Sequence, residues 1–343
     1  ESLVLTARYI EGTLHAHLQS GMLSWRTTQM HLQGKAEVSI AWKGELAPDS
    51  LTGMLYLTEV QYALPSYNLA IHNKEALPIS FTRRELTLSS IHLYTVDKQP
   101  LLLEGSVMLQ QRTPTVHLHL TAHGTNLLQS QATRESLLYG KALVSGSITL
   151  DGPLNELSLD GNLRVLPSSS LHYIYKDAIL TTSNQLDQVV TFVSFSREDA
   201  SPTQQKSRIA TRSLTANISI TIDPTAQLEV SLGANQQNEI KLQGGGMLTL
   251  QYIPPMGLRL SGKYLIETGH MTLNVPLLHV SNMTLRQGSS ITWSGNPLNP
   301  LLNIEAEERI RSSVTLDGSP QSVLFVAGVS VSETLERLNI QFT

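Results

Sequence analysis

Apolar and polar residues alternate along most of this chain with a period of two. Within residues 258–267, Leu258, Leu260, Tyr264 and Ile266 are apolar, while the residues between them are mostly polar. Successive side chains of a β-strand point to opposite faces of a sheet, whereas a helix repeats every 3.6 residues. This period therefore predicts a strand with one apolar and one polar face.

The alternating segments recur along the chain, with turns rich in glycine, proline and aspartate between them. Their spacing of about 8–15 residues predicts roughly twenty strands. Gly244, Gly245 and Gly246 precede Met247 rather than Lys and Ser or Thr, so we interpret them as a bulge or bend and not as a phosphate loop. Helical periodicity is nearly absent, and no segment could cover a long sheet.

An all-β chain must hide its aliphatic face from water, at about 25 cal/mol per Å² of apolar area. Two sheets can pack as a sandwich, one sheet can close into a barrel, or the sheet can fold over and leave a groove that something else fills. The period alone does not separate these three solutions. We predict that the aliphatic face consists of Leu103, Val107, Leu109, Leu118, Leu120, Ile148, Leu150, Leu157, Leu159, Leu163, Ile218, Ile220, Leu228, Val230, Leu248, Leu250, Leu258, Leu260, Ile266, Leu273 and Val275.

Composition narrows the functional classes. Charged residues make up 15% of the 343 residues, against roughly 25% in an ordinary soluble domain. The net charge of −4 argues against a nucleic-acid partner that needs a basic surface. The chain has no cysteine, which excludes disulfides and thiolate chemistry. It begins at Glu1 and ends in a strand pattern at Thr343, so we expect a piece of a longer protein.

Candidate chemistry is sparse. His117 and His119 lie two residues apart, a spacing that can chelate a metal from one face of a strand. Their apolar neighbours take the inward face, so we expect these imidazoles to point to solvent, with no carboxylate at ligand spacing nearby. The acidic run Glu305–Glu308 is typical of a solvated strand. With no nucleophile or zinc motif in the sequence, we expect no catalytic residue, no metal, no cofactor and no enzyme activity.

Several longer stretches carry a family resemblance. YGKALVSGSITLDGPLNELSLDGNLRV (139–165), LHYIYKDAILTTSNQLDQVVTFVSF (171–195) and GLRLSGKYLIETGHMTLN (257–274) resemble repeating units of the TamB family, AsmA-like envelope proteins of Gram-negative bacteria. The stretch GSSITWSGNPLNPLLNIEAE (288–307) resembles the most specific signature of that family's C-terminal domain. The signature residues are Gly288, Ile291, Trp293, Gly295, Asn296 and Pro297. The resemblance covers residues 139–343 well and residues 1–138 loosely, which divides the chain into two continuous β-groove segments.

The resemblance implies a long antiparallel sheet bent into a half-open "β-taco" with an aliphatic interior. It also implies a periplasmic position between the two membranes. The inner membrane would be reached through a segment outside this chain, and an Omp85-type β-barrel protein would be the outer-membrane partner. Phospholipid transfer and the assembly of outer-membrane proteins are both implied, and a purely structural sandwich remains a third hypothesis. Trp293 suits the rim of such a groove, because its ring is amphipathic.

Overall fold

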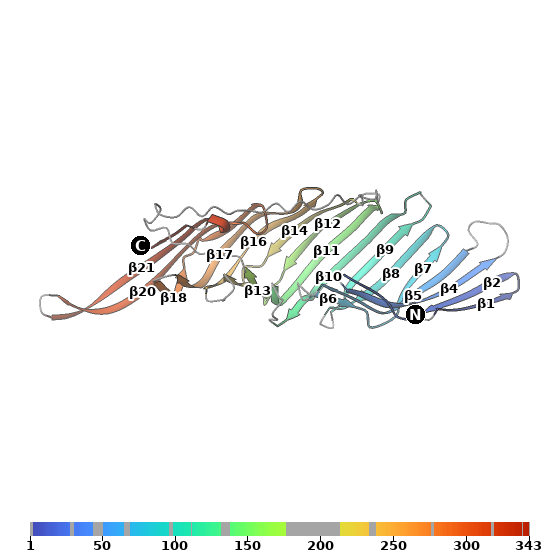
Figure 1. The fold of residues 1–343 in the computed structure, drawn as a ribbon, viewed down its shortest axis with the longest axis horizontal. Coiled ribbons are helices and arrows are strands. Elements are labelled where there is room, and N and C mark those ends of the chain that lie inside the picture. The colour runs from blue at the N-terminus through green and yellow to red at the C-terminus, as the bar shows by residue number, and fades with distance from the viewer. Residues whose placement is uncertain are drawn as a thin grey trace, which may run out of the picture.

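The computed structural model describes residues 3–27, 31–43, 51–64, 69–95, 99–110, 112–131, 138–175, 213–232, 238–275, 278–316, 319–337 and 339–342. These residues form one 22-stranded sheet with a single short 3₁₀ turn at Leu335–Arg337. The strands cross the long axis of the molecule obliquely and follow one another along it in chain order (Figure 1). The all-β groove prediction is confirmed. In the part of the chain described here, no helix has the length and apolarity to cross a membrane.

The strands of the first half are β1 Leu3–Ile10, β2 Thr13–Ser20, β3 Leu23–Arg26, β4 His31–Lys43, β5 Leu51–Leu64, β6 Leu69–His72, β7 Leu77–Thr82, β8 Glu85–Leu93, β9 Leu101–Met108, β10 Thr115–Ser130 and β11 Leu138–Pro153. Those of the second half are β12 Glu156–Val165, β13 Ser170–Tyr175, β14 Ser213–Ile222, β15 Gln227–Leu232, β16 Asn238–Ile253, β17 Gly257–Val275, β18 Leu278–Leu285, β19 Ser290–Gly295, β20 Leu301–Leu316, β21 Ser319–Thr334 and β22 Asn339–Phe342.

Long strands bend across the fold, and pairs of short strands build its two walls. β11 pairs with β12 through residues 144–151 and with β13 through residues 138–141. β16 pairs in the same way with β14 and β15. The long strands bend at bulges, where the register shifts by an extra residue and the partner changes. One such shift lies between Gln243 and Gly244, so the bend predicted at the three glycines is confirmed.

Buried serines fix the corners between the short strands. The Ser169 hydroxyl donates to the Leu166 carbonyl (2.8 Å) and accepts from the Leu143 amide (3.1 Å), which ties the β12–β13 corner to β11. Ser289 repeats the arrangement at the β18–β19 corner and accepts from the Glu305 amide (3.1 Å). Because both serines are almost fully buried, these bonds satisfy backbone groups that water does not reach.

The apolar positions of successive strands meet in register across the sheet. Directly paired residues of a sheet share a face, so each such series is a continuous apolar row. One row runs from β9 to β19 through Leu103, Leu120, Ile148, Gly161, Ile218, Leu250, Leu260 and Gly295. A neighbouring row runs through Leu101, Ala122, Gly146, Leu163, Ile220, Leu248, Gly262 and Trp293.

Two pairings depart from the antiparallel pattern. β12 pairs with β14 and β13 pairs with β15 in parallel, on either side of residues 176–212. We call these two pairings the parallel seam. Part of the stretch that resembles the TamB family, residues 176–195, lies outside the described residues.

On the C-terminal side of the parallel seam, the largest buried cluster of the described chain lies between β16 and β22. It includes Ile266, Met271, Met283, Ile304 and Ile340.

Candidate functional site

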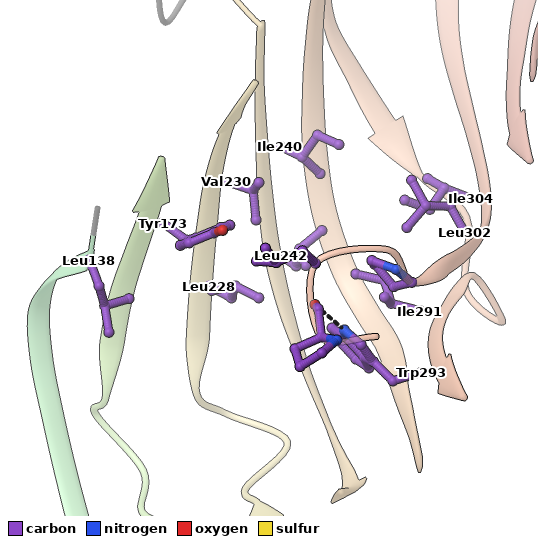
Figure 2. A pocket seen from close by; sticks show the side chains of 13 residues that line it. Leu138, Tyr173, Leu228, Val230, Ile240, Leu242, Ile291, Trp293, Leu302 and Ile304 are labelled. Atoms are coloured by element: carbon purple, nitrogen blue, oxygen red, sulfur yellow. Dashed lines mark hydrogen bonds between the residues drawn. The ribbon is translucent and has the colours of Figure 1, made fainter. Parts of the chain in front are cut away.

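An apolar cavity of about 370 Å³ opens on the inner face near the C-terminal end of the groove. Strands β11, β13, β15, β16, β19 and β20 supply its lining, and the turn after β19 crosses one side of it (Figure 2). Leu228 and Val230 come from β15, Ile240 and Leu242 from β16, and Ile291 from β19. No described side chain that lines this cavity is charged, and the hydroxyl of Tyr173 is one of its few polar groups.

The signature turn is folded back over the cavity. The indole nitrogen of Trp293 donates a hydrogen bond to the Pro297 carbonyl oxygen at 3.0 Å (Figure 2). The Asn296 side chain accepts from the Leu298 amide at 3.0 Å, which closes the turn locally. The Asn299 side chain accepts from the Glu336 amide at 3.1 Å and so fastens the turn to the 3₁₀ turn that follows β21. Trp293, Pro297 and Leu298 all line the cavity, so the turn forms one of its walls.

The other signature residues shape the approach to this turn. Gly288 lies at the β18–β19 corner with φ of +95°, in a region of backbone space that favours glycine. Gly295 has φ of +149°, and a side chain there would approach the Arg259 guanidinium. Ile291 is buried in the main cluster, and Trp293 packs against that cluster from its edge. That Trp293 occupies the rim of the groove stays a prediction.

The structure places most of the predicted lining residues in one of two settings. Leu228 and Val230 line the cavity. Most of the others lie on the apolar rows or beside them and are half-buried, as expected for the wall of a groove. They are Leu103, Val107, Leu118, Leu120, Ile148, Leu150, Leu157, Leu159, Leu163, Ile220, Leu250 and Leu260.

The remaining predicted residues differ. Ile218, Leu248 and Ile266 are buried, whereas Leu258, at the start of β17, is 52% exposed. Leu109 follows the end of β9. The side chains of Leu273 and Val275 lie outside the described residues. The sequence pattern missed Leu138 and Tyr173, which contribute to the cavity from β11 and β13. β11 and β13 pair over only a few residues, so the sequence around Leu138 and Tyr173 shows no long alternation of apolar and polar residues.

The histidines of β10 face solvent, as expected. His117, His119 and His123 are exposed, but Asp151 lies directly opposite His117 and forms an ion pair with it. The expectation of no carboxylate beside these histidines was therefore wrong, because Asp151 is distant in sequence and adjacent only through β10–β11 pairing. Glu305 and Glu307 pair with Arg286 at 3.3 and 2.9 Å on the outer surface.

A polar cluster that sequence reasoning missed lies behind the cavity wall. His172, Glu229 and Glu239 alternate with the cavity-lining residues of β13, β15 and β16, so they face the opposite side of the sheet. Burial raises the pKa of the Glu229 carboxyl to about 7, and the adjacent Glu239 adds to this shift. The pKa of Glu239 is lowered by its hydrogen bond with Glu229, and burial lowers the pKa of His172.

Comparison with known proteins adds one match. A family model described as the TamB C-terminal domain matches residues 93–343, which is more than two thirds of the chain. None of the curated proteins matches. The matched range starts before the segment boundary expected at residue 139 and includes the whole cavity, the signature turn and the outer polar cluster.

Proposed function

The chain belongs to the TamB C-terminal domain family, an envelope family of Gram-negative bacteria with a role in outer-membrane biogenesis, and from this premise we propose that its groove carries phospholipid acyl chains between the inner and outer membranes. On this proposal the chain lies in the periplasm, and a segment outside it reaches the inner membrane. It acts as a conduit and not as an enzyme.

The observation that carries the proposal is the unbroken register of the apolar rows. Row members on neighbouring strands are directly paired from β9 to β19, through β10, β11, β12, β14, β16 and β17. Strand spacing is about 4.8 Å, so an acyl chain lying along a row meets a new apolar side chain or a glycine at each step. A polar residue in a row would interrupt this path, and none of the two rows' members is polar.

The energetics suit movement as well as binding. Each methylene removed from water contributes about 0.8 kcal/mol, so even a partly inserted tail is held. The contribution is non-directional and similar along the row, so no single position traps the tail. Because the lining offers almost no hydrogen-bonding groups, the headgroup would remain outside the groove, where water solvates it.

Two substitutions on β16 test this proposal. Leu250 is half-buried on the apolar row, whereas Met247 faces the other side of the sheet and is 67% exposed. We expect the 343-residue chain, purified from a membrane-containing lysate, to carry phospholipid in native mass spectrometry. Leu250→Asp should lose most of that lipid, and Met247→Asp should keep it. Circular dichroism would check that both fold. A lipid-free parent chain, or equal lipid on both variants, would contradict the proposal.

A second function is favoured by one further observation. Residues 308–316 of β20 and 319–328 of β21 pair only with one another among the described strands, and they project as a hairpin beyond the groove (Figure 1). On β21, Leu324, Phe325 and Val326 are about half exposed. An unpaired apolar edge can add a strand from another protein. An Omp85-type barrel or a client strand is the partner expected for such a scaffold.

The edge can be tested separately from the groove. Phe325→Lys places a charge on the hairpin and should abolish cross-linking to an outer-membrane barrel protein while leaving bound lipid unchanged. If Phe325→Lys loses bound lipid but keeps the cross-link, the result favours the conduit. If it keeps bound lipid but loses the cross-link, the result favours the scaffold.

A further inference from the structure

We propose that His172, Glu229 and Glu239 form a binding site for a divalent transition-metal ion on the outer face of the sheet. Each residue offers one ligand atom, and the three atoms lie within 4.8 Å of one another. The residues come from β13, β15 and β16, three neighbouring strands. This proposal does not rest on the proposed lipid function, because the cluster faces away from the groove.

The histidine ring is held in place on two sides. The His172 Nε2 atom lies 2.8 Å from the hydroxyl of Ser231, which is 2% exposed. The Tyr139 ring stacks on the imidazole, with ring centroids 4.3 Å apart and planes 17° apart. The Nδ1 atom is thereby directed at the carboxylates and lies 2.9 Å from Glu229 Oε1. Such outer contacts set the tautomer and orientation of metal-ligating histidines in proteins.

The carboxylates are also positioned. The two carboxylate oxygens of Glu229 have different partners. Oε1 faces His172, and Oε2 lies 3.7 Å from the Lys241 ammonium. Glu239 Oε2 lies 3.3 Å from the same ammonium. Both carboxylates are about 30% exposed, and Lys241 is 56% exposed. Lys241 therefore contacts both carboxylates from one side, while Glu229 Oε1 stays directed at His172.

The ligand types select the class of ion. One imidazole nitrogen with two carboxylate oxygens suits Zn²⁺ and its first-row neighbours, whereas Ca²⁺ and Mg²⁺ prefer oxygen alone. Ligand atoms of a tetrahedral zinc ion are about 3.4 Å apart, given metal–ligand bonds of about 2.0–2.1 Å. Small side-chain rotations would reach that spacing from the present one. Three protein ligands leave the fourth position for water.

The direct test is titration of the complete 343-residue chain, freed of any affinity tag and treated with EDTA, with ZnCl₂ in a calorimeter. We expect one zinc ion per chain. Co²⁺ in place of Zn²⁺ should give visible absorption bands of tetrahedral or five-coordinate cobalt, and X-ray absorption at the zinc edge should show one imidazole and no sulfur.

Four variants make the site falsifiable. His172→Gln, Glu229→Gln and Glu239→Gln should each weaken zinc binding by at least tenfold. Lys241→Met should tighten it at least threefold, because it removes a competing cation that a purely structural ion-pair network would need. The matched control is His117→Gln, another strand histidine beside a carboxylate, for which the described residues supply no third ligand.

Circular dichroism with and without zinc would confirm that each variant folds. No zinc binding by the parent chain would overturn the proposal. Undiminished binding by folded His172→Gln, or equal loss in His117→Gln, would also overturn it, because the ion would then be bound elsewhere on the chain.

Discussion

The open section, β1–β5, and the closed end, β16–β22, follow the same alternating pattern but bury it very differently. No described side chain of β1–β5 is fully buried, and Leu5 and Tyr9 on β1 are 67% and 70% exposed. In the closed end, Ile266, Met271 and Ile304 are at most 2% exposed.

The difference does not lie in a lack of large inner side chains. One inner row of the open section pairs the small residues Ala7 and Ala16, but the adjacent row on the same face pairs Leu5, Leu18, Val38 and Leu55. The closed end carries Tyr264, Met271 and Met283 at such positions, and residues of both walls belong to one cluster. Alternation therefore sets which face turns inward, while contact between the two walls sets how much of that face is buried.

The strongest contrast should come from removing a core isoleucine. Ile304→Ala deletes a fully buried side chain at the closed end and should cost about 3–4 kcal/mol, since a cavity remains. Ile40→Ala in the open section should cost about 1 kcal/mol, because its partly exposed side chain loses less burial. Urea unfolding can be read by Trp293 for the first region and by Trp42 for the second, with the other tryptophans changed to Phe. Equal costs would refute the contrast.

A glycine at each bend gives the next largest difference. A Cβ atom on Gly246 would lie 2.1 Å from the Lys263 carbonyl oxygen, a backbone atom of the neighbouring strand. Gly246→Ala should therefore cost about 2 kcal/mol or more. At Gly34 the nearest atom is a Val60 methyl at 3.2 Å, which can move, so Gly34→Ala should cost less than about 1 kcal/mol. The same urea titrations measure both.

The turn that walls the cavity should show a smaller effect. Trp293→Phe keeps an aromatic ring but loses the hydrogen bond to Pro297, so about 1 kcal/mol should be lost. Amide hydrogen exchange should rise at Leu298 and Asn299 and stay unchanged in β1–β5. Exchange that rises equally in both regions would mean that the turn does not act locally.

The smallest expected effect has the opposite sign. The Tyr264 hydroxyl is buried, and the described residues offer it no hydrogen-bond partner. Burial also raises the pKa of Tyr264 to about 12, as expected of a phenol in apolar surroundings. Tyr264→Phe should leave stability unchanged or raise it by up to about 1 kcal/mol. A clear loss in urea unfolding would show that the hydroxyl has a partner after all.

Strands and their inner faces could be predicted from the sequence because alternation is local. The bend at Gly244–Gly246 and the inward direction of Leu248, Leu250 and Leu260 follow from neighbouring residues alone. The walls could not be predicted in this way, because a corner such as the one at Ser169 depends on a distant backbone partner on β11.

The candidate sites show the same limit. Leu228 and Val230 were predicted from alternation, but Tyr173 reaches the same cavity only through strand pairing across residues 176–212. His172 and Glu229 are likewise brought together by that pairing, and neither residue has a neighbour in sequence that suggests metal binding. Spacing motifs detect sites built on one element, whereas this cluster spans three strands.

The parallel pairing of β13 with β15 could form in more than one register during folding. Elsewhere short turns or corners fix how most strands align, but β13 and β15 meet without one. A slip of two residues would keep every apolar side chain on the inner face, so hydrophobic packing alone discriminates poorly against it. Such a slip would place Gln227 or Ser231 opposite His172 in place of Glu229. Contacts between polar side chains on the outer face, such as the pair of His172 and Glu229, thus select the register that also aligns the apolar side chains of the inner face.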